Sequence, residues 1–147
     1  NFTDDASTAI STLLLGKTGG TVTLNSPLGT LSILGGAVTL AAGGYTITNV
    51  SITNGGQLAL PASTTTTITS TFEGQTGVTG YVYSTTFGTR ATLSTANVID
   101  LKYVNAQDIA FAGTGTWYKV ASTVDGGNNT GWINKPAAIN MVSMGDF

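Results

Sequence analysis

The run Asp125-Gly126-Gly127-Asn128-Asn129 contains residue types with which proteins bind Ca²⁺, because hard cations prefer carboxylate, amide and carbonyl oxygens. It holds a single carboxylate, however, and the acidic spacing of an EF-hand is missing. Glycine and asparagine are also the residues that adopt positive φ in tight turns. The run therefore predicts a structural turn around Asp125, Asn128 and Asn129, with a calcium loop as the alternative.

No residue pattern indicates a reaction centre. Asp100 and Asp108 lie eight positions apart, which is about 26 Å along a straight strand, too far for the two carboxylates of a glycosidase. The chain has no His and no Cys, so the Ser-His-Asp arrangement and thiolate metal sites are excluded. No phosphate-binding glycine loop is present. We expect a non-enzymatic protein without a metal or cofactor.

Four aromatic residues near the C-terminal end admit two interpretations. Trp117, Tyr118, Trp132 and Tyr103 are suited to form a platform for sugars. Alternatively, Trp117 and Trp132 plug the end of a hydrophobic core around the asparagine-rich turn, which is the interpretation we favour. Aromatic residues concentrate throughout the second half, which predicts a wider core there; they include Tyr81, Tyr83, Phe87, Tyr103, Phe111, Trp117, Tyr118 and Trp132.

The low charge of the chain limits the classes of partner that we expect it to bind. Only 8% of the 147 residues are charged, and no charged side chain lies between Lys17 and Glu73. The net charge of −2 and the scattered cations argue against a nucleic-acid partner, which needs clustered Lys and Arg. Polar Thr, Ser, Asn and Gly interrupt every apolar run, so no membrane-spanning helix is expected.

One segment near the start has a helical pattern. Over 4–16, an Asp can cap the N-terminus, Gly16 can end the helix, and the apolar residues fall on one face. This short helix either covers the end of the β domain or forms an arm that docks onto a neighbouring subunit. With the tail, it supplies the candidate contact residues for an oligomer or another partner: Phe2, Ile10, Leu13, Leu14, Met141, Met144 and Phe147.

From residue 21 onward, apolar residues alternate with hydroxyl side chains, and glycine pairs separate the runs. Examples are 21–24, 30–34, 37–40, 45–52, 57–60 and 65–72. Period-two alternation indicates strands with one buried face. We predict an all-β protein, a short-runged right-handed β-helix or β-solenoid, with a jelly-roll-like β-sandwich as the alternative. The expected division is an N-terminal arm or helix (1–17), one all-β domain (18–133) and an irregular tail (134–147).

Two sequence motifs carry a resemblance to known proteins. Gly88-Thr89-Arg90-Ala91-Thr92-Leu93-Ser94, followed by Asp125-Gly126-Gly127-Asn128-Asn129-Thr130-Gly131-Trp132-Ile133, is similar to a module of β-rich phage virion structural proteins, also seen in bacterial surface proteins. Arg90 stands where that module usually has Gln. The resemblance covers roughly residues 65–133. The opening Asn1-Phe2-Thr3-Asp4-Asp5-Ala6-Ser7-Thr8 also resembles the start of small phage virion proteins.

This resemblance implies a structural role on a virion surface and supplies no catalytic residue. The leading hypothesis is a capsid decoration (cement) protein that stabilises the head as a symmetric oligomer. Its partners would be further copies of itself, in a homotrimer as is usual for such proteins, and the major capsid protein. The alternative is a receptor-binding or spacer module of a tail fibre, or of a bacterial adhesin or surface filament. Glycan binding is expected only under that alternative.

Overall fold

The computed structural model describes residues 1–4, 9–16 and 19–137, and every regular element in these ranges is a β-strand. The strands form three sheets, here called sheets 1, 2 and 3. Sheet 1 consists, in spatial order, of β1 (Phe2–Thr3), β3 (Gly20–Thr23), β5 (Ala37–Leu40), β7 (Gln57–Leu60), β9 (Gly80–Ser84), β12 (Val104–Gln107) and β15 (Val124–Asp125).

Sheets 2 and 3 form the other walls of the same structure. Sheet 2 consists of β2 (Ile10–Leu15), β4 (Leu28–Ile33), β6 (Tyr45–Ile52), β8 (Thr65–Gly74), β10 (Ala91–Ser94) and β13 (Ile109–Ala112). Sheet 3 consists of β11 (Val98–Leu101), β14 (Thr116–Lys119) and β16 (Trp132–Asn134).

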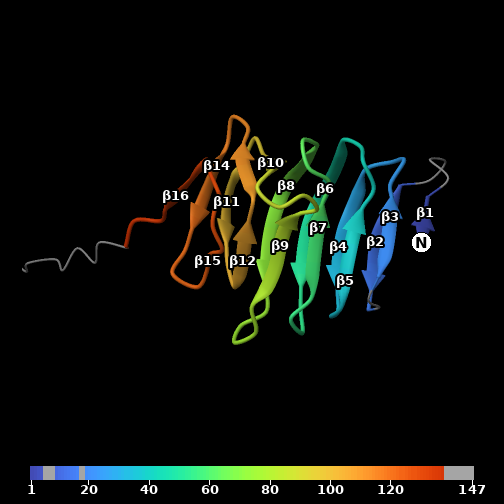
Figure 1. Cartoon of the computed structure of the whole chain (residues 1–147), viewed down its shortest axis with the longest axis horizontal. Coiled ribbons are helices and arrows are strands. Elements are labelled where there is room, and N and C mark those ends of the chain that lie inside the picture. The colour runs from blue at the N-terminus through green and yellow to red at the C-terminus, as the bar shows by residue number, and fades with distance from the viewer. Residues whose placement is uncertain (5–8, 17–18, 138–147) are drawn as a thin grey trace, which may run out of the picture.

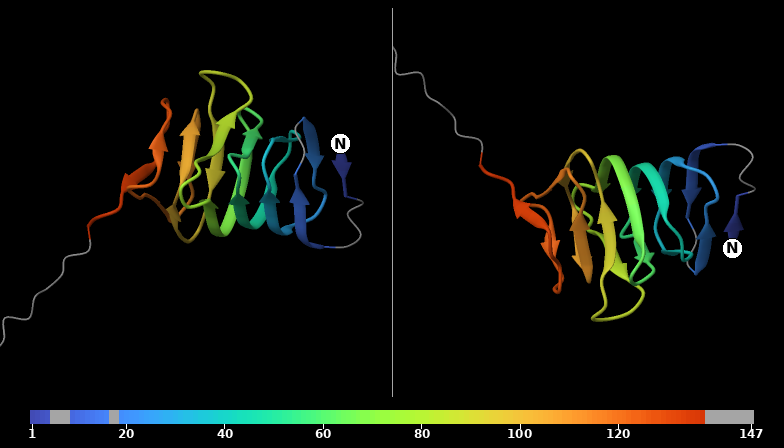
Figure 2. Two further views of the ribbon diagram at one scale, coloured as in Figure 1. Left: turned by 90° about the horizontal axis from the view of Figure 1, so that it is seen from below. Right: turned by 90° about the horizontal axis from the view of Figure 1, so that it is seen from above.

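The chain winds through these sheets as a coil. Successive strands from β1 to β10 alternate between sheets 1 and 2, and from β11 onward the chain also passes through sheet 3. Neighbouring strands within each sheet, which belong to successive turns of the coil, pair in parallel (Figure 1). The turns stack side by side from the N-terminal to the C-terminal end (Figure 2). Parallel stacking of this kind is a β-solenoid, so the predicted fold class is confirmed, and the antiparallel jelly-roll alternative is wrong.

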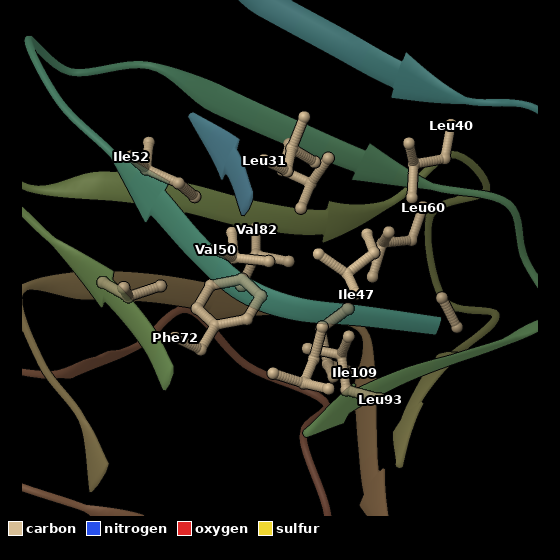
Figure 3. Close-up of a cluster of buried hydrophobic side chains, with 14 of the residues drawn as sticks. Leu31, Leu40, Ile47, Val50, Ile52, Leu60, Phe72, Val82, Leu93 and Ile109 are labelled. Carbon is tan, nitrogen blue, oxygen red and sulfur yellow. The ribbon is translucent and has the colours of Figure 1, made fainter. Parts of the chain in front are cut away.

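The alternation seen in the sequence places one set of side chains inside the coil. In β6, for example, Ile47, Val50 and Ile52 are fully buried, whereas Thr46 and Thr48 face solvent. Equivalent residues of neighbouring turns meet in one continuous apolar core (Figure 3). Phe72 and Val82 lie in this core with the aliphatic residues, so the two main sheets close over a single hydrophobic interior.

The predicted N-terminal helix is wrong for the part of 4–16 that the structure describes. Ile10–Leu15 is β2, and it pairs with β4 from Ile10↔Leu28 to Leu15↔Ile33. Leu13 and Leu15 alternate toward the core, a pattern that fits period two as well as a short helix. The neighbouring strand supplies hydrogen bonds and an apolar surface, which outweigh a weak local helical preference. Residues 5–8 lie outside the described ranges.

The turns differ in length, which explains why the sequence shows no strict repeat. Ile10 pairs with Leu28, 18 residues later, whereas Thr65 pairs with Thr92, 27 residues later. The longest turn includes the loop between β9 and β10, residues 85–90, which projects beyond the neighbouring turns (Figure 2). A fixed period is therefore not required for stacking, since the extra residues leave the coil as loops.

The cross-section changes from two walls to three toward the C-terminal end. The register between β6 and β8 shifts after Ile47↔Ile68, because β8 has one residue more before Asn49↔Thr71, and β8 then runs on to Gly74. The end of β8 pairs with the residue after β11 through Glu73↔Lys102, so β8 leads into sheet 3. This wider end accommodates the largest buried side chain, Trp117.

Candidate functional site

The outer face of sheet 1 carries four large polar or aromatic side chains on two adjacent turns. Tyr81 and Tyr83 of β9 pair in register with Asn105 and Gln107 of β12. Alternate residues of a strand point to the same face about 6.6 Å apart, and neighbouring strands are about 4.8 Å apart. Because Val82 and Ala106 point into the core, these four side chains form a two-by-two array on the outside.

This array is hollowed along its length, and we call the hollow the tyrosine groove. A depression of about 210 Å³ is lined by Tyr81, Tyr83, Asn105, Gln107 and Gly126. A second depression of about 240 Å³ shares Tyr83 and Gln107 and extends to Phe87 in the loop 85–90. The two depressions therefore adjoin, and the groove runs from sheet 1 to the base of the projecting loop.

Gly126 keeps the C-terminal side of the groove open. A Cβ at this position would lie 2.5 Å from Oδ1 of Asn105 and 2.8 Å from the backbone oxygen of Ala106. Any side chain here would displace Asn105 or fill the space next to Gln107. The absence of a side chain at Gly126 therefore keeps the groove open, in addition to the part that this glycine has in the tight turn.

The groove is polar but almost without charge. The side-chain amides of Asn105 and Gln107 make no hydrogen bond to another side chain or backbone group of the described residues. Among the described residues that line the groove, the one carboxylate is that of Asp108, which is 3% exposed and accepts a hydrogen bond from Nδ2 of Asn128. The groove therefore presents aromatic rings, amides and hydroxyls to solvent.

The two tryptophans lie at the C-terminal end of the core. Trp117 is 1% exposed, packs against Phe111 with ring centroids 5.2 Å apart, and donates from Nε1 to the carbonyl oxygen of Ala112 at 3.0 Å. Trp132, in the last described strand, is half-buried and packs on the same Phe111. Nζ of Lys119 lies 5.3 Å from the centroid of the Trp132 ring. The buried ring of Trp117 is out of reach of a sugar.

The tight turn predicted at residues 125–129 forms hydrogen bonds with the preceding coil of the solenoid. Asn129 donates from Nδ2 to the oxygen of Ala106 and to Oδ1 of Asp125, both at 2.7 Å. Its Oδ1 accepts from the amide of Ile109 at 2.9 Å, and Oδ1 of Asp125 also accepts from the amide of Gly127. The side-chain oxygens on which a calcium loop would depend are thus engaged with protein donors.

Asn128 links this turn to a loop much earlier in the sequence. Its φ is 54°, and Arg90 donates from Nε to its backbone oxygen at 2.8 Å and from Nη2 to its Oδ1 at 2.6 Å. Asn128 in turn donates to Asp108. Arg90, at the position where the resembled module usually has Gln, therefore clamps the end of the loop 85–90 to the turn.

The other acidic residues do not converge. Asp100 of sheet 3 forms an ion pair with Lys135, whereas Asp108 follows β12 and contacts Asn128. Within the described ranges, no three residues of the types Asp, Glu, Cys and His gather closely enough to hold a metal ion. Nor does any helix there have the length and apolar character needed to cross a membrane.

The N-terminal contact candidates fall into two groups. Phe2, Ile10 and Leu13 are partly buried against the core, whereas Leu14 points outward and is 59% exposed. Exposed Leu34 lies beside the end of β2, because its amide donates to the oxygen of Leu15. Met141, Met144 and Phe147 of the tail lie outside the described residues.

A hollow of about 380 Å³ adjoins this apolar surface. It is lined by residues of the first turns, among them Phe2, Leu14, Leu15, Val22 and Val38. Within the described part of the chain, β1 and β2 are the edge strands of sheets 1 and 2 at this end, and β15 and β13 are the opposite edges. We call this end of the solenoid, comprising β1, β2 and Leu34, the first-turn surface.

The tyrosine groove was missed at the level of sequence. The spacing Tyr81-Val82-Tyr83 predicts that both tyrosines share a face, but not which face is outside. The sequence therefore predicts that these rings and Phe87 belong to a wider core, whereas Phe87 is 86% exposed and Tyr81 is 40% exposed. Comparison of the chain with protein-family models, with curated proteins and with solved structures finds no match.

Proposed function

We propose that this chain is a non-enzymatic structural protein of a bacteriophage surface, held in the particle by its first-turn surface. The specific form proposed is a capsid decoration protein that forms a symmetric oligomer, a homotrimer, on the major capsid protein. The observation that carries the proposal is the combination of a continuous parallel solenoid with an exposed apolar surface at one end of it.

The solenoid supplies what a permanent structural element requires. Its strands are short, but every turn is hydrogen-bonded to the next and contributes to a single core. Stability in such folds accumulates through contacts between neighbouring turns. The outward faces carry mainly hydroxyl groups and few ions, and this surface packs against like subunits without burying unpaired charges.

The first-turn surface supplies a contact of the right chemistry. Leu14 and Leu34 are exposed apolar side chains beside a hollow into which a neighbour's side chains fit. The edge strands also present backbone groups suited to pairing with another chain. Exposed apolar groups beside a strand edge are typical of surfaces that become covered in an assembly.

The test is the solution mass of the chain, measured by light scattering, for the natural sequence and for the double variant Leu14→Asp/Leu34→Asp. We expect a trimer that the double variant converts to a folded monomer. Val98→Asp is the matched control, because Val98 is 65% exposed but lies in sheet 3, and it should leave the trimer intact.

A second assay tests the capsid itself. Capsids stripped of decoration should bind the natural chain and resist heating better, and the double variant should not bind. If the natural chain is monomeric and does not bind stripped capsids, the decoration proposal is wrong.

A second candidate function is a spacer or receptor-binding module of a tail fibre or of a bacterial surface protein. The observation that favours it is the set of exposed aromatic side chains along the tyrosine groove, away from the first-turn surface. A chain with this role would be anchored at one end and display its side wall. It would bind cells or isolated surface glycans, and loss of the trimer would not abolish that binding.

A further inference from the structure

The tyrosine groove has the composition of a binding site for one kind of small molecule. Its walls are two aromatic rings in adjacent positions, Tyr81 and Tyr83, with Phe87 at the far end. Opposite the tyrosines, in register, stand the amides of Asn105 and Gln107. Ligand sites combine apolar and aromatic walls with a few convergent polar groups, as here.

The side chains of the groove are not explained by the stability of the fold. Phe87 is 86% exposed, so its ring contributes little to the core. The amides of Asn105 and Gln107 lack hydrogen-bond partners among the described residues, although an amide offers two donors and one acceptor. In β7, the preceding strand of the same wall, the outward positions in register with the two tyrosines hold Gln57 and Ala59, neither of which is aromatic.

Charge narrows the class of ligand. None of the described residues that line the groove is cationic, which argues against phosphate, sulfate and nucleic acid as ligands. The lining includes one carboxylate, that of Asp108, which is buried and accepts a hydrogen bond from Asn128. The ligand that fits is neutral, with apolar faces for the rings and hydroxyl groups for the amides.

We propose that the tyrosine groove binds a neutral oligosaccharide. The C–H faces of successive sugar rings pack on Tyr81, Tyr83 and Phe87, whose apolar bodies and polar tips suit such a surface. Asn105 and Gln107 donate to and accept from the sugar hydroxyls. The two adjoining depressions, of about 210 Å³ and 240 Å³, provide two places along the groove at which successive rings would lie. This proposal rests on the second candidate function, display of the side wall of the solenoid, and it does not require the trimer of the decoration proposal.

The experiment uses the full chain and an array of defined oligosaccharides, neutral ones built from glucose, galactose, mannose or N-acetylglucosamine, and sialylated and sulfated ones. Neutral binders are then titrated in solution by calorimetry and by NMR of the tyrosine ring protons. We expect binding of at least one neutral oligosaccharide, with shifts of the Tyr81 and Tyr83 ring signals in the unmodified chain.

Variants locate the site. Tyr81→Ala and Gln107→Ala should each weaken binding tenfold or more while the unfolding temperature stays within a few degrees. Tyr118→Ala is the matched control, because Tyr118 is a partly exposed tyrosine in sheet 3, and binding should be unchanged.

The proposal is overturned if no neutral oligosaccharide binds, if only charged ones bind, or if binding survives both groove variants. Should Tyr81→Ala fail to fold, the ring-signal shifts and Gln107→Ala still decide the matter. A natural chain that is monomeric and does not bind stripped capsids, but does bind a neutral oligosaccharide, would contradict the decoration proposal and leave this one standing.

Discussion

Phe111 and Trp132 stack almost face to face, with ring centroids 4.8 Å apart and an interplanar angle of 12°. Phe111 is buried in sheet 2 and Trp132 lies in sheet 3, so the stack joins two walls of the solenoid at its C-terminal end. Trp117, the register partner of Trp132 on the adjacent strand, completes the cluster with its ring centroid 5.2 Å from that of Phe111. The three rings separate the aliphatic core from solvent where the described turns end.

The first prediction concerns this aromatic cluster. Trp132→Ala should lower the free energy of unfolding by about 1–3 kcal/mol, through lost stacking and lost apolar burial. Trp117→Ala should cost more, about 3–5 kcal/mol, because that ring is fully buried. Urea unfolding followed by circular dichroism measures both. Ile133→Ala is the control, since Ile133 is exposed beside Trp132, and it should change stability by less than about 0.5 kcal/mol. An unfolding curve unchanged by Trp132→Ala would mean that this ring does not protect the core.

The second prediction concerns the clamp between Arg90 and Asn128. Arg90→Ala removes two hydrogen bonds and should cost about 1 kcal/mol, since the pair is exposed to solvent. Asn128→Ala should cost more, because it also leaves Asp108 without its partner and places alanine at positive φ. Arg90→Lys should recover only part of the loss, because an ammonium group cannot donate in the forked geometry.

The double variant tests whether the two residues act on each other. In a double-mutant cycle, the Arg90→Ala/Asn128→Ala chain should be more stable than the two single losses predict, by about 0.5 kcal/mol or more. Strictly additive losses would show that the clamp has no energetic coupling. Arg90→Gln, the residue usual in the resembled module, should behave like a partial loss.

The third prediction concerns the close approach of neighbouring turns at Gly115. A Cβ there would lie 2.0 Å from the backbone oxygen of Asn97 on the preceding turn, closer than any real contact. Gly115→Ala should therefore cost about 3 kcal/mol or more, since the backbone on both turns must move. Gly20→Ala is the matched control, because a Cβ at Gly20 meets nothing within 4 Å. Comparable thermal unfolding of the two variants would contradict the tight stacking described for the C-terminal turns.

The strands of sheets 1 and 2 could be predicted because apolar residues, which become buried, alternate with polar ones in their sequences. In β6, Ile47 and Thr48 already show which residues face inward, and the glycine pairs mark the turns. Ile10–Leu15 was misjudged because its six residues fit a short helix as well as a strand. Only the edge of β4 decides between the two, and that edge comes from residues later in the chain.

The candidate site was less predictable, because it depends on register between turns of unequal length. Tyr81 lies beside Asn105 because this turn of the solenoid places residues 24 positions apart in register. No repeated motif in the sequence indicates that spacing. The same holds for Arg90 and Asn128, which are 38 residues apart. The sequence shows the types of these residues, but it does not show which residues lie beside them in the folded chain.

The last prediction concerns alkaline pH and Tyr45. This side chain is 6% exposed, and burial raises the pKa of its hydroxyl above the ordinary value of 10.0, with a smaller opposing effect from the backbone of Leu24. The folded protein therefore holds the proton more tightly than the unfolded chain does. The contribution to stability is complete below pH 10 and is lost as the pH rises through the folded-state pKa. Unfolding free energies measured by urea titration from pH 8 to pH 11 should thus fall more steeply for the natural chain than for Tyr45→Phe. Tyr81→Phe, which alters an exposed tyrosine, should keep the steeper slope. Equal slopes for the natural chain and Tyr45→Phe would mean that the Tyr45 hydroxyl titrates alike in the folded and unfolded states.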